Sequence, residues 1–208
     1  MDKEYWEGYY SSANLTENPS GFAEFCASQY AVDCGHIFDI GCGNGRDTFY
    51  FSRMSIPVSG IEQCEVAVAE NLEKKSIILS NANFHQGDFS SCNYDGLVDG
   101  PYSIYSRFTL HAINYTEEER LFSHLNQVKN LRYIFIEARS IRDGLYGQGT
   151  EVGPHEYVSS HYRRFIDPVE LKNKLSARFD VVYFAESQGF AKTDTEDPCL
   201  IRLIAKRR

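Results

Sequence analysis

A cluster of glycines stands where a buried strand is expected to turn into a helix. The cluster follows the apolar run over residues 36–40 and reads Asp39-Ile40-Gly41-Cys42-Gly43-Asn44-Gly45. Glycines let the backbone approach a ligand closely, and the free N–H groups of a helix start bind acceptor atoms. The dinucleotide pattern is G-x-G-x-x-G, but Arg46 holds the place of its third glycine. A bulky side chain there disfavours the close strand–helix packing of a dinucleotide site.

Two acids follow at the expected ends of later strands. Glu62 comes 21 residues after Gly41, directly after an apolar run over residues 57–61. This spacing agrees with the rule that places a ribose-binding acid about 20 residues after such a turn. Asp88 lies between Gly87 and Phe89, after the expected strand over residues 83–86. The chain therefore carries a glycine turn and two acids in series.

With these three features in this order and spacing, the chain from about Phe22 onward resembles the class I S-adenosylmethionine-dependent methyltransferases. The resemblance implies S-adenosylmethionine as cofactor. It implies that Glu62 accepts hydrogen bonds from the two ribose hydroxyls, that Asp88 accepts one from the adenine amino group, and that Phe89 offers its backbone N–H to the ring. The cofactor-binding residues it implies are Asp39, Gly41, Cys42, Gly43, Asn44, Gly45, Glu62, Gln63, Asp88 and Phe89.

Cationic side chains follow the expected ends of several strands. Ligands of open α/β sheets bind at these ends, and arginine binds carboxylates and phosphates in bidentate fashion. The residues expected to bind a small anionic acceptor are Arg107, His111, Arg139, His161, Arg163 and Arg164. His111 is also the candidate catalytic base, because the ordinary pKa of histidine lies near neutral pH. The alternative for Arg163 and Arg164 is a role in surface ion pairs. The alternative for His111 is a partly buried histidine with a structural role.

The aromatic N-terminal segment is the remaining candidate for acceptor binding. Trp6 and Tyr10 lie in no expected strand and precede the first helix. In the family that the chain resembles, this segment often folds over the cofactor and the acceptor. We therefore assign Trp6 and Tyr10 to a lid, with simple packing at the edge of the core as the equal alternative.

Helix and strand patterns alternate along the chain, which is typical of a sheet with crossover helices. They predict an α/β, Rossmann-like, doubly wound sheet of seven strands, mostly parallel with an antiparallel last strand. Residues 1–31 would form the lid and first helix, and residues 32–208 the methyltransferase part of the same domain. We expect strands over residues 36–40, 57–61, 83–86, 102–105, 133–136, 180–184 and 199–205, and helices over residues 22–31, 48–53 and 65–75.

Two later helices have start signals. Thr116 with Glu119 fits a capping box, and Asp167 followed by Pro168 fits an N-cap with proline at the first helical position. The stretch over residues 140–161 is polar and rich in glycine, and we expect a long loop there. Loops of this length inside a domain are often functional.

Composition limits the partners. The formal net charge of the 208 residues is −8, which disfavours nucleic acid. No apolar run reaches the roughly 18 residues of a membrane span, and no signal peptide is visible. The six cysteines form no CxxC pair, so we expect reduced thiols in a cytoplasmic protein and no metal site.

The family that the chain resembles also narrows the acceptor. Its nucleobase-methylating members carry an Asn/Asp-Pro-Pro-Tyr motif after the fourth strand, whereas this chain reads Tyr105-Ser106-Arg107-Phe108. The stretches over residues 136–140 and 161–165 are similar to a bacterial subgroup found in surface-polysaccharide, phosphonate and other small-molecule pathways. We expect methylation of a small anionic molecule, preferentially on oxygen. The alternatives are a protein or RNA methyltransferase and a non-catalytic S-adenosylmethionine-binding subunit.

Overall fold

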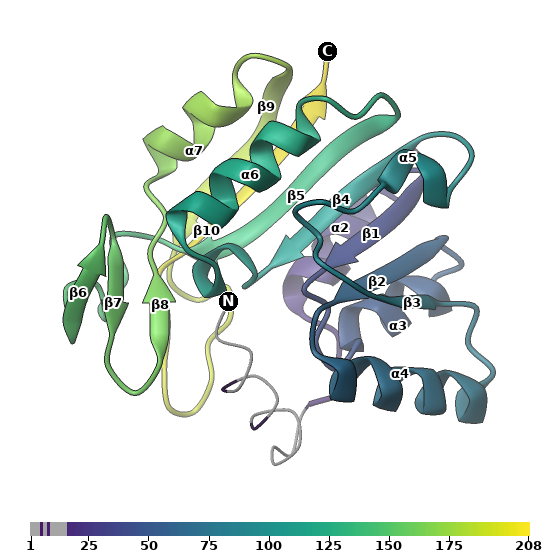
Figure 1. Ribbon diagram of the computed structural model, residues 1–208, viewed down its shortest axis with the longest axis horizontal. Coiled ribbons are helices and arrows are strands. Elements are labelled where there is room, and N and C mark those ends of the chain that lie inside the picture. The colour runs from purple at the N-terminus through teal and green to yellow at the C-terminus, as the bar shows by residue number, and fades with distance from the viewer. Residues whose placement is uncertain (1–4, 6–7, 9–15) are drawn as a thin grey trace.

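The computed structural model describes Tyr5, Gly8 and residues 16–208 of the chain, and its main element is a seven-stranded sheet (Figure 1). The strands in spatial order are β3 (Asn83–Gln86), β2 (Val58–Glu62), β1 (His36–Ile40), β4 (Tyr102–Arg107), β5 (Leu131–Arg139), β10 (Leu200–Arg207) and β9 (Phe179–Ser187). The first five strands pair in parallel, and β10 is antiparallel to both of its neighbours. The predicted fold class is therefore confirmed.

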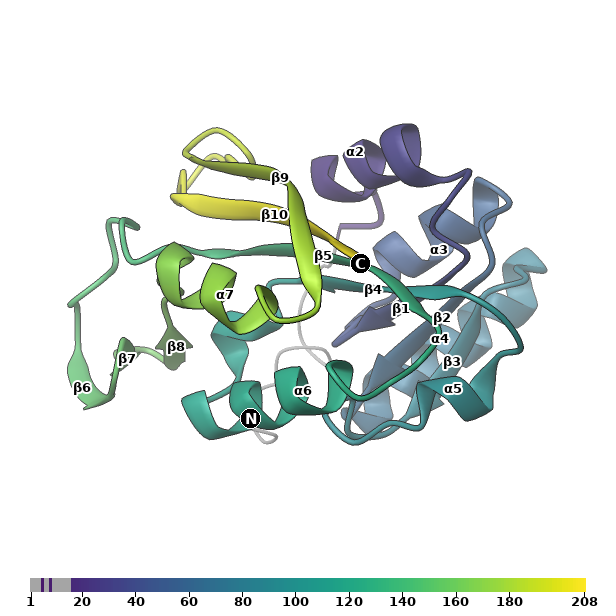
Figure 2. The ribbon, with the colours of Figure 1, turned by 90° about the horizontal axis from the view of Figure 1, so that it is seen from above.

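Helices cover both faces of this sheet (Figure 2). One face carries α2 (Gly21–Tyr30), α3 (Arg46–Arg53) and α4 (Glu65–Ile78), and the other carries α5 (Tyr94–Leu97), α6 (Tyr115–Leu125) and α7 (Pro168–Leu175). Strand β5 shows why two cores form. Tyr133 and Phe135 pack into the core under α2 and α3, while Ile134 and Ile136 pack into the core under α6 and α7. Successive side chains of a strand point to opposite faces, so an apolar run supplies both cores.

Helix starts follow the expected chemistry, with one correction. Asp167 caps α7 by accepting from the N–H of Val169 at 2.7 Å, as predicted. The capping box of α6 is Asn114 with Glu117, so the predicted box of Thr116 with Glu119 is wrong. The carboxamide of Asn114 accepts from the N–H of Glu117 at 2.8 Å, and the Glu117 carboxylate accepts from the N–H of Asn114 at 2.9 Å. Asparagine caps at least as well as threonine, and the helix starts earlier as a result.

The predicted long loop over residues 140–161 is also corrected, because it contains two strands. A small antiparallel sheet joins β6 (Thr150–Gly153), β7 (Glu156–Val158) and β8 (Tyr162–Arg164). These strands are three or four residues long, so their alternation is weak in the sequence. The hydroxyl of Tyr162 donates to the carbonyl of Ile113 at 3.3 Å, which places the small sheet beside the short helix η1 (Leu110–Ala112).

None of the helices in the described part of the chain is both long and apolar enough to cross a membrane. Trp6 and Tyr10 lie outside the described residues, so their assignment to a lid stays a prediction. The proposed division at residue 31 also stays a prediction.

Candidate active site

The glycine turn joins β1 to α3 and is held from behind. Gly41, Gly43 and Gly45 all have positive φ, at 65°, 55° and 70°. Gly45 is the N-cap of α3, and a Cβ atom there would lie 2.7 Å from Oδ1 of Asn71. Both the backbone angle and the space therefore require glycine at this position. The Asn71 side chain also donates to the carbonyl of Gly43 at 2.7 Å, which fixes the turn against α4.

Glu62 lies at the carboxyl end of β2 and faces this turn. Its side chain is buried, with the residue only 4% exposed. One carboxylate oxygen accepts from the N–H of Gly43 at 3.0 Å, and the other accepts from the N–H groups of Gln63 at 2.8 Å and Cys64 at 2.9 Å. The carboxylate is thus aimed at the glycine turn by three backbone donors.

Asp39 supports the turn from inside the sheet. It is buried, and its carboxyl group accepts from the hydroxyl of Thr48 at 2.6 Å. Burial raises the pKa of Asp39 to about 8, and the nearby Asp47 carboxylate adds to this. Burial therefore favours the protonated form of the Asp39 carboxyl group. A bound cation beside it would favour its ionised form.

Asp88 and Phe89 follow β3 but differ in environment. The Asp88 side chain is partly exposed, accepts from the N–H of Ser90 at 2.8 Å and pairs with Arg120 at 3.4 Å. Phe89 is buried in the core, and its carbonyl accepts from the hydroxyl of Tyr94 at 2.5 Å. Asp88 can accept from a ligand, while Phe89 can contribute through its backbone only.

The other predicted cofactor residues line the same turn. Asn44 donates from its side chain to the carbonyl of Thr16 at 3.1 Å. A Cβ atom on Gly60 would lie 2.6 Å from the sulfur of Cys42, so the Cys42 side chain packs against β2. Gln63 follows Glu62 and is half-buried. Asn44, Cys42 and Gln63 therefore lie close to the glycine turn, as the sequence predicts.

Arg107 belongs to an ion-pair row that crosses three strands. Arg107 on β4 and Arg202 on β10 are both direct register partners of Glu137 on β5. Nε of Arg107 lies 2.9 Å from one Glu137 oxygen, and Nε of Arg202 lies 2.6 Å from the other. The Glu137 side chain is 1% exposed. Arg107 therefore has a structural partner that the sequence analysis missed.

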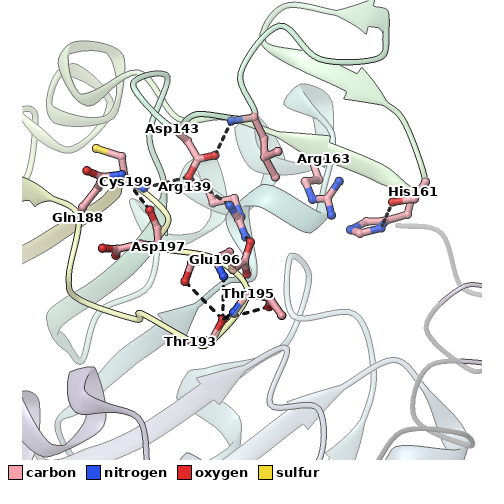
Figure 3. Close-up of polar contacts among 12 residues, drawn as sticks. Arg139, Asp143, His161, Arg163, Gln188, Thr193, Thr195, Glu196, Asp197 and Cys199 are labelled. Carbon is pink, nitrogen blue, oxygen red and sulfur yellow. Dashed lines mark hydrogen bonds and ion pairs between the residues drawn. The ribbon is translucent and has the colours of Figure 1, made fainter.

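Arg139 is also paired, by two carboxylates at the end of β5 (Figure 3). Its Nη1 atom lies 3.1 Å from Oδ2 of Asp143, and its Nη2 atom lies 2.6 Å from Oε2 of Glu196. Asp143 is buried, whereas Glu196 comes from the loop between β9 and β10 and has a side chain that is 44% exposed. The charge of Arg139 is thus balanced within the chain.

Arg163 and Arg164 are separated by the alternation of β8. The Arg164 side chain is 3% exposed and forms an ion pair with the buried Glu118 of α6. Its assignment to acceptor binding is corrected for this reason, because its charge is buried against an acid. Arg163 faces the other way and donates to the hydroxyl of Ser159 at 3.3 Å. Among the described residues, no carboxylate forms an ion pair with Arg163.

His111 lies on η1, among these cations. Its ring packs against Phe108 with a centroid distance of 4.9 Å. The Nδ1 atom is buried and has no hydrogen-bond partner in the described part of the chain. Burial holds the pKa of His111 well below its ordinary value, and the charges of Arg139, Arg163 and Arg107 lower it further. His111 is therefore neutral at neutral pH.

His161 lies at the outer side of this group. Its ring stacks on Tyr5 with a centroid distance of 4.6 Å, and its Nδ1 atom lies 3.2 Å from the hydroxyl of Ser160. Figure 3 shows Arg163 between Arg139 and His161. The structure therefore brings Arg139, Arg163 and His161 to one region, as the sequence predicts.

One group of described residues has the composition of a metal site. Ligand-type atoms of His155, Asp167 and Glu170 lie within 4.8 Å of one another. Asp167 already caps α7, and Nδ1 of His155 lies 2.9 Å from the hydroxyl of Tyr146. These contacts account for the grouping without an ion. That the protein needs no metal stays a prediction.

Comparisons with known proteins bear on the fold that carries this site. No family model matches the chain. It is 33% identical over 69 residues, 31% of its length, to an uncharacterized methyltransferase of Schizosaccharomyces pombe, of which the match covers 48%. The chain spans about half the length of the curated relatives it matches.

Solved structures match over much more of the chain. PH0226 from Pyrococcus horikoshii matches with a TM-score of 0.73 at 13% identity, over 100% of both chains. The glycopeptide N-methyltransferase MtfA, complexed with S-adenosylmethionine, matches with a TM-score of 0.68 at 14% identity, over 91% of this chain and 95% of its own. This chain has the class I methyltransferase fold. Within that fold, the glycine turn, Glu62 and Asp88 lie at the carboxyl ends of β1, β2 and β3.

The sequence indicated the arginines near the candidate acceptor site but not the acids that pair with them. Glu137, Asp143 and Glu196 each pair with an arginine that had been assigned to the acceptor. Glu137 precedes Arg139 by two residues on one strand and so shares its face, but its partners are Arg107 and Arg202 on the neighbouring strands. No local signal marks Glu196, which is 57 residues from Arg139.

Proposed function

We propose that the chain is an S-adenosylmethionine-dependent methyltransferase that methylates a small anionic molecule, preferentially on oxygen. The observation that carries this proposal is the Glu62 carboxylate, held at the glycine turn by three backbone N–H groups within a class I methyltransferase fold. Assignment to the bacterial small-molecule subgroup, and a cytoplasmic location, belong to the same proposal. Transfer of a labelled methyl group would separate it from non-catalytic cofactor binding.

The residues present fit the cofactor. An ionised carboxylate has about four acceptor positions, and Glu62 uses three of them on backbone donors. One position is open to a ribose hydroxyl, and replacement of the hydrogen bond from the Gly43 N–H would free a second. Asp39 can ionise beside an ammonium group, and Asp88 retains exposed acceptor atoms. When bound, S-adenosylmethionine would supply an activated methyl group on a positively charged sulfur.

The remaining residues act on the acceptor. Methyl transfer depends mainly on alignment of the two reactants, and an alcohol acceptor also needs a base. His111 is neutral, so its free nitrogen can accept the hydroxyl proton. The lowered pKa of His111 makes it a weak base. An anionic group bound beside it would raise that pKa again, since an opposite charge favours the protonated form.

Arg163 is the cation best suited to recognise an anionic acceptor. Arg107, Arg139 and Arg164 are each paired with carboxylates of the chain. Burial and the nearby Arg139 lower the pKa of Arg163, so a bound anion there would relieve repulsion between the two guanidinium groups. We therefore assign the first contact with the acceptor's charge to Arg163.

The cofactor assignment predicts that S-adenosylhomocysteine binds and that NAD does not. Replacing Glu62 by alanine removes two charge-assisted hydrogen bonds to the ribose, each worth about 1.5–3 kcal/mol before water compensates. We expect the affinity for S-adenosylhomocysteine, measured by calorimetry, to fall at least ~10-fold. The control is Glu17→Ala, which removes an exposed glutamate that pairs only with Lys74 among the described residues. Equal affinities for Glu62→Ala and the wild type would contradict the assignment.

The acceptor assignment predicts a selective effect at Arg163. We expect Arg163→Ala to weaken binding of the probe anion citrate by ~10-fold, because it removes a cation that no carboxylate of the described residues pairs with. The affinity for S-adenosylhomocysteine should stay within about 2-fold. Competition calorimetry measures both. Arg142→Ala is the matched control, since Arg142 is 74% exposed and pairs with Glu186. Citrate binding that is unchanged in Arg163→Ala would remove Arg163 from the site.

A further inference from the structure

The loop between β9 and β10 (residues 188–199) places one of its carboxylates on a cation of the candidate acceptor site. Oε2 of Glu196 lies 2.6 Å from Nη2 of Arg139, which makes it a close ion pair. The two side chains differ in burial. Arg139 is 7% exposed and fixed at the end of β5, whereas Glu196 is 44% exposed and enters from the surface (Figure 3).

The second partner of Arg139 is Asp143, which further contacts hold in place. Oδ2 of Asp143 lies 3.1 Å from Nη1 of Arg139 and also accepts from the N–H of Cys199 at 2.9 Å. Its other oxygen accepts from the N–H of Leu145 at 2.9 Å. The Asp143 carboxylate therefore contacts three groups of its own chain, Arg139, Cys199 and Leu145, and cannot leave without breaking all three contacts. Glu196 has no such commitment among the described residues.

The fold of the loop does not depend on the Glu196 side chain. Asp197 holds the loop base, since its carboxylate accepts from the N–H of Gly189 at 2.7 Å and its carbonyl accepts from the Gln188 side chain at 3.1 Å. The N–H of Thr193 donates to the carbonyl of Glu196 at 2.8 Å. These contacts use the backbone of residue 196, so its carboxylate can move away from Arg139 while the loop keeps its base.

The charges favour replacement of Glu196 by another anion. Arg139 and Arg163 carry two positive charges, and Asp143 and Glu196 carry two negative ones, so the group is neutral with Glu196 in place. Removal of Glu196 leaves one net positive charge beside the Nδ1 atom of His111, which has no hydrogen-bond partner among the residues that the structure describes. The site that Glu196 vacates therefore has the charge and the arginine geometry that bind a carboxylate.

We propose that the Glu196 carboxylate is an internal substitute for a carboxylate of the acceptor, which binds by displacing Glu196 from Arg139. This inference rests on the proposed function and names its substrate class as carboxylic acids. The Glu196 carboxylate pairs with Arg139 and balances part of its charge within the chain. On binding, the acceptor's charge first contacts Arg163, and its carboxylate then takes the position of Glu196 on Nη2 of Arg139, beside His111.

The test removes only the charge of Glu196. We expect Glu196→Gln to bind malonate about 5-fold more tightly than the wild type, because the competing carboxylate is gone. The gain is limited because a partly exposed ion pair contributes little free energy. NMR titration measures the affinity, with and without S-adenosylhomocysteine. Asp194→Asn is the matched control. It removes one negative charge from an exposed position of the same loop, and its malonate affinity should stay within about 2-fold of the wild type.

Each outcome has one meaning. Tighter malonate binding in Glu196→Gln but not in Asp194→Asn supports displacement. Equal gains in both variants would reduce Glu196 to a general surface charge, and no gain would overturn the proposal. Tighter binding of inorganic phosphate than of malonate would overturn the carboxylate class. Failure of S-adenosylhomocysteine to bind any variant would contradict the proposed function instead, since malonate binding is also measured without it.

Discussion

Gly43→Val is expected to reduce affinity for S-adenosylhomocysteine at least ~100-fold while leaving the chain folded. Gly43 has a φ of 55° and is clamped on both sides, by Glu62 through its N–H and by Asn71 through its carbonyl. The turn therefore cannot retreat to make room for a side chain. A β-branched residue is also strained at positive φ. Because the turn is held on both sides, we expect a valine side chain at this position to occupy the space of the ligand. Calorimetry measures the affinity, and circular dichroism the fold.

The control is a second glycine of positive φ that lies away from the glycine turn, so that a valine there strains the backbone without reaching the cofactor site. Gly100 has a φ of 103° and lies just before the amino end of β4, whereas the glycine turn follows the carboxyl end of β1. No described atom lies within 4 Å of a Cβ added to Gly100. Gly100→Val should therefore destabilise the chain by about 1–2 kcal/mol and bind S-adenosylhomocysteine normally. If Gly43→Val also bound normally, the glycine turn would not be a cofactor site.

The parallel half of the sheet could be predicted because its signals are local. The run over residues 36–40 leads into glycines, and Glu62 and Asp88 follow later strands at a regular spacing. The order of the strands then follows from the fold class. The small sheet of β6, β7 and β8 could not be predicted in this way, since its strands are three or four residues long.

The candidate acceptor site was predicted by residue type but not by pairing. A sequence shows that Arg163 and Arg164 are adjacent, and β8 then points them to opposite sides, so that only Arg164 meets Glu118. The partners of Arg107 and Arg139 come from β5 and from a loop near the C-terminus. Which cations remain unpaired depends on these distant contacts, and local patterns carry no information about them.

Glu137→Gln is expected to lower the free energy of unfolding by about 3 kcal/mol or more. Glu137 is almost fully buried and neutralises Arg107 and Arg202, whose side chains are 16% and 10% exposed. Loss of its charge leaves two guanidinium groups close together without a counter-ion. Removal of one partner from a buried ion pair typically costs 3–5 kcal/mol, and urea denaturation followed by circular dichroism measures the change.

The matched control for Glu137 is an acid of the same sheet whose ion pair is exposed. Asp180 on β9 lies 2.7 Å from Arg208, and both side chains are more than half exposed. Asp180→Asn should change the free energy of unfolding by less than about 1 kcal/mol, since surface pairs contribute little. The contrast tests whether the Arg107–Glu137–Arg202 row joins β4, β5 and β10 as a structural unit. If Glu137→Gln were as stable as Asp180→Asn, the two arginines would have other counter-ions, and Arg107 would return to the candidate residues for acceptor binding.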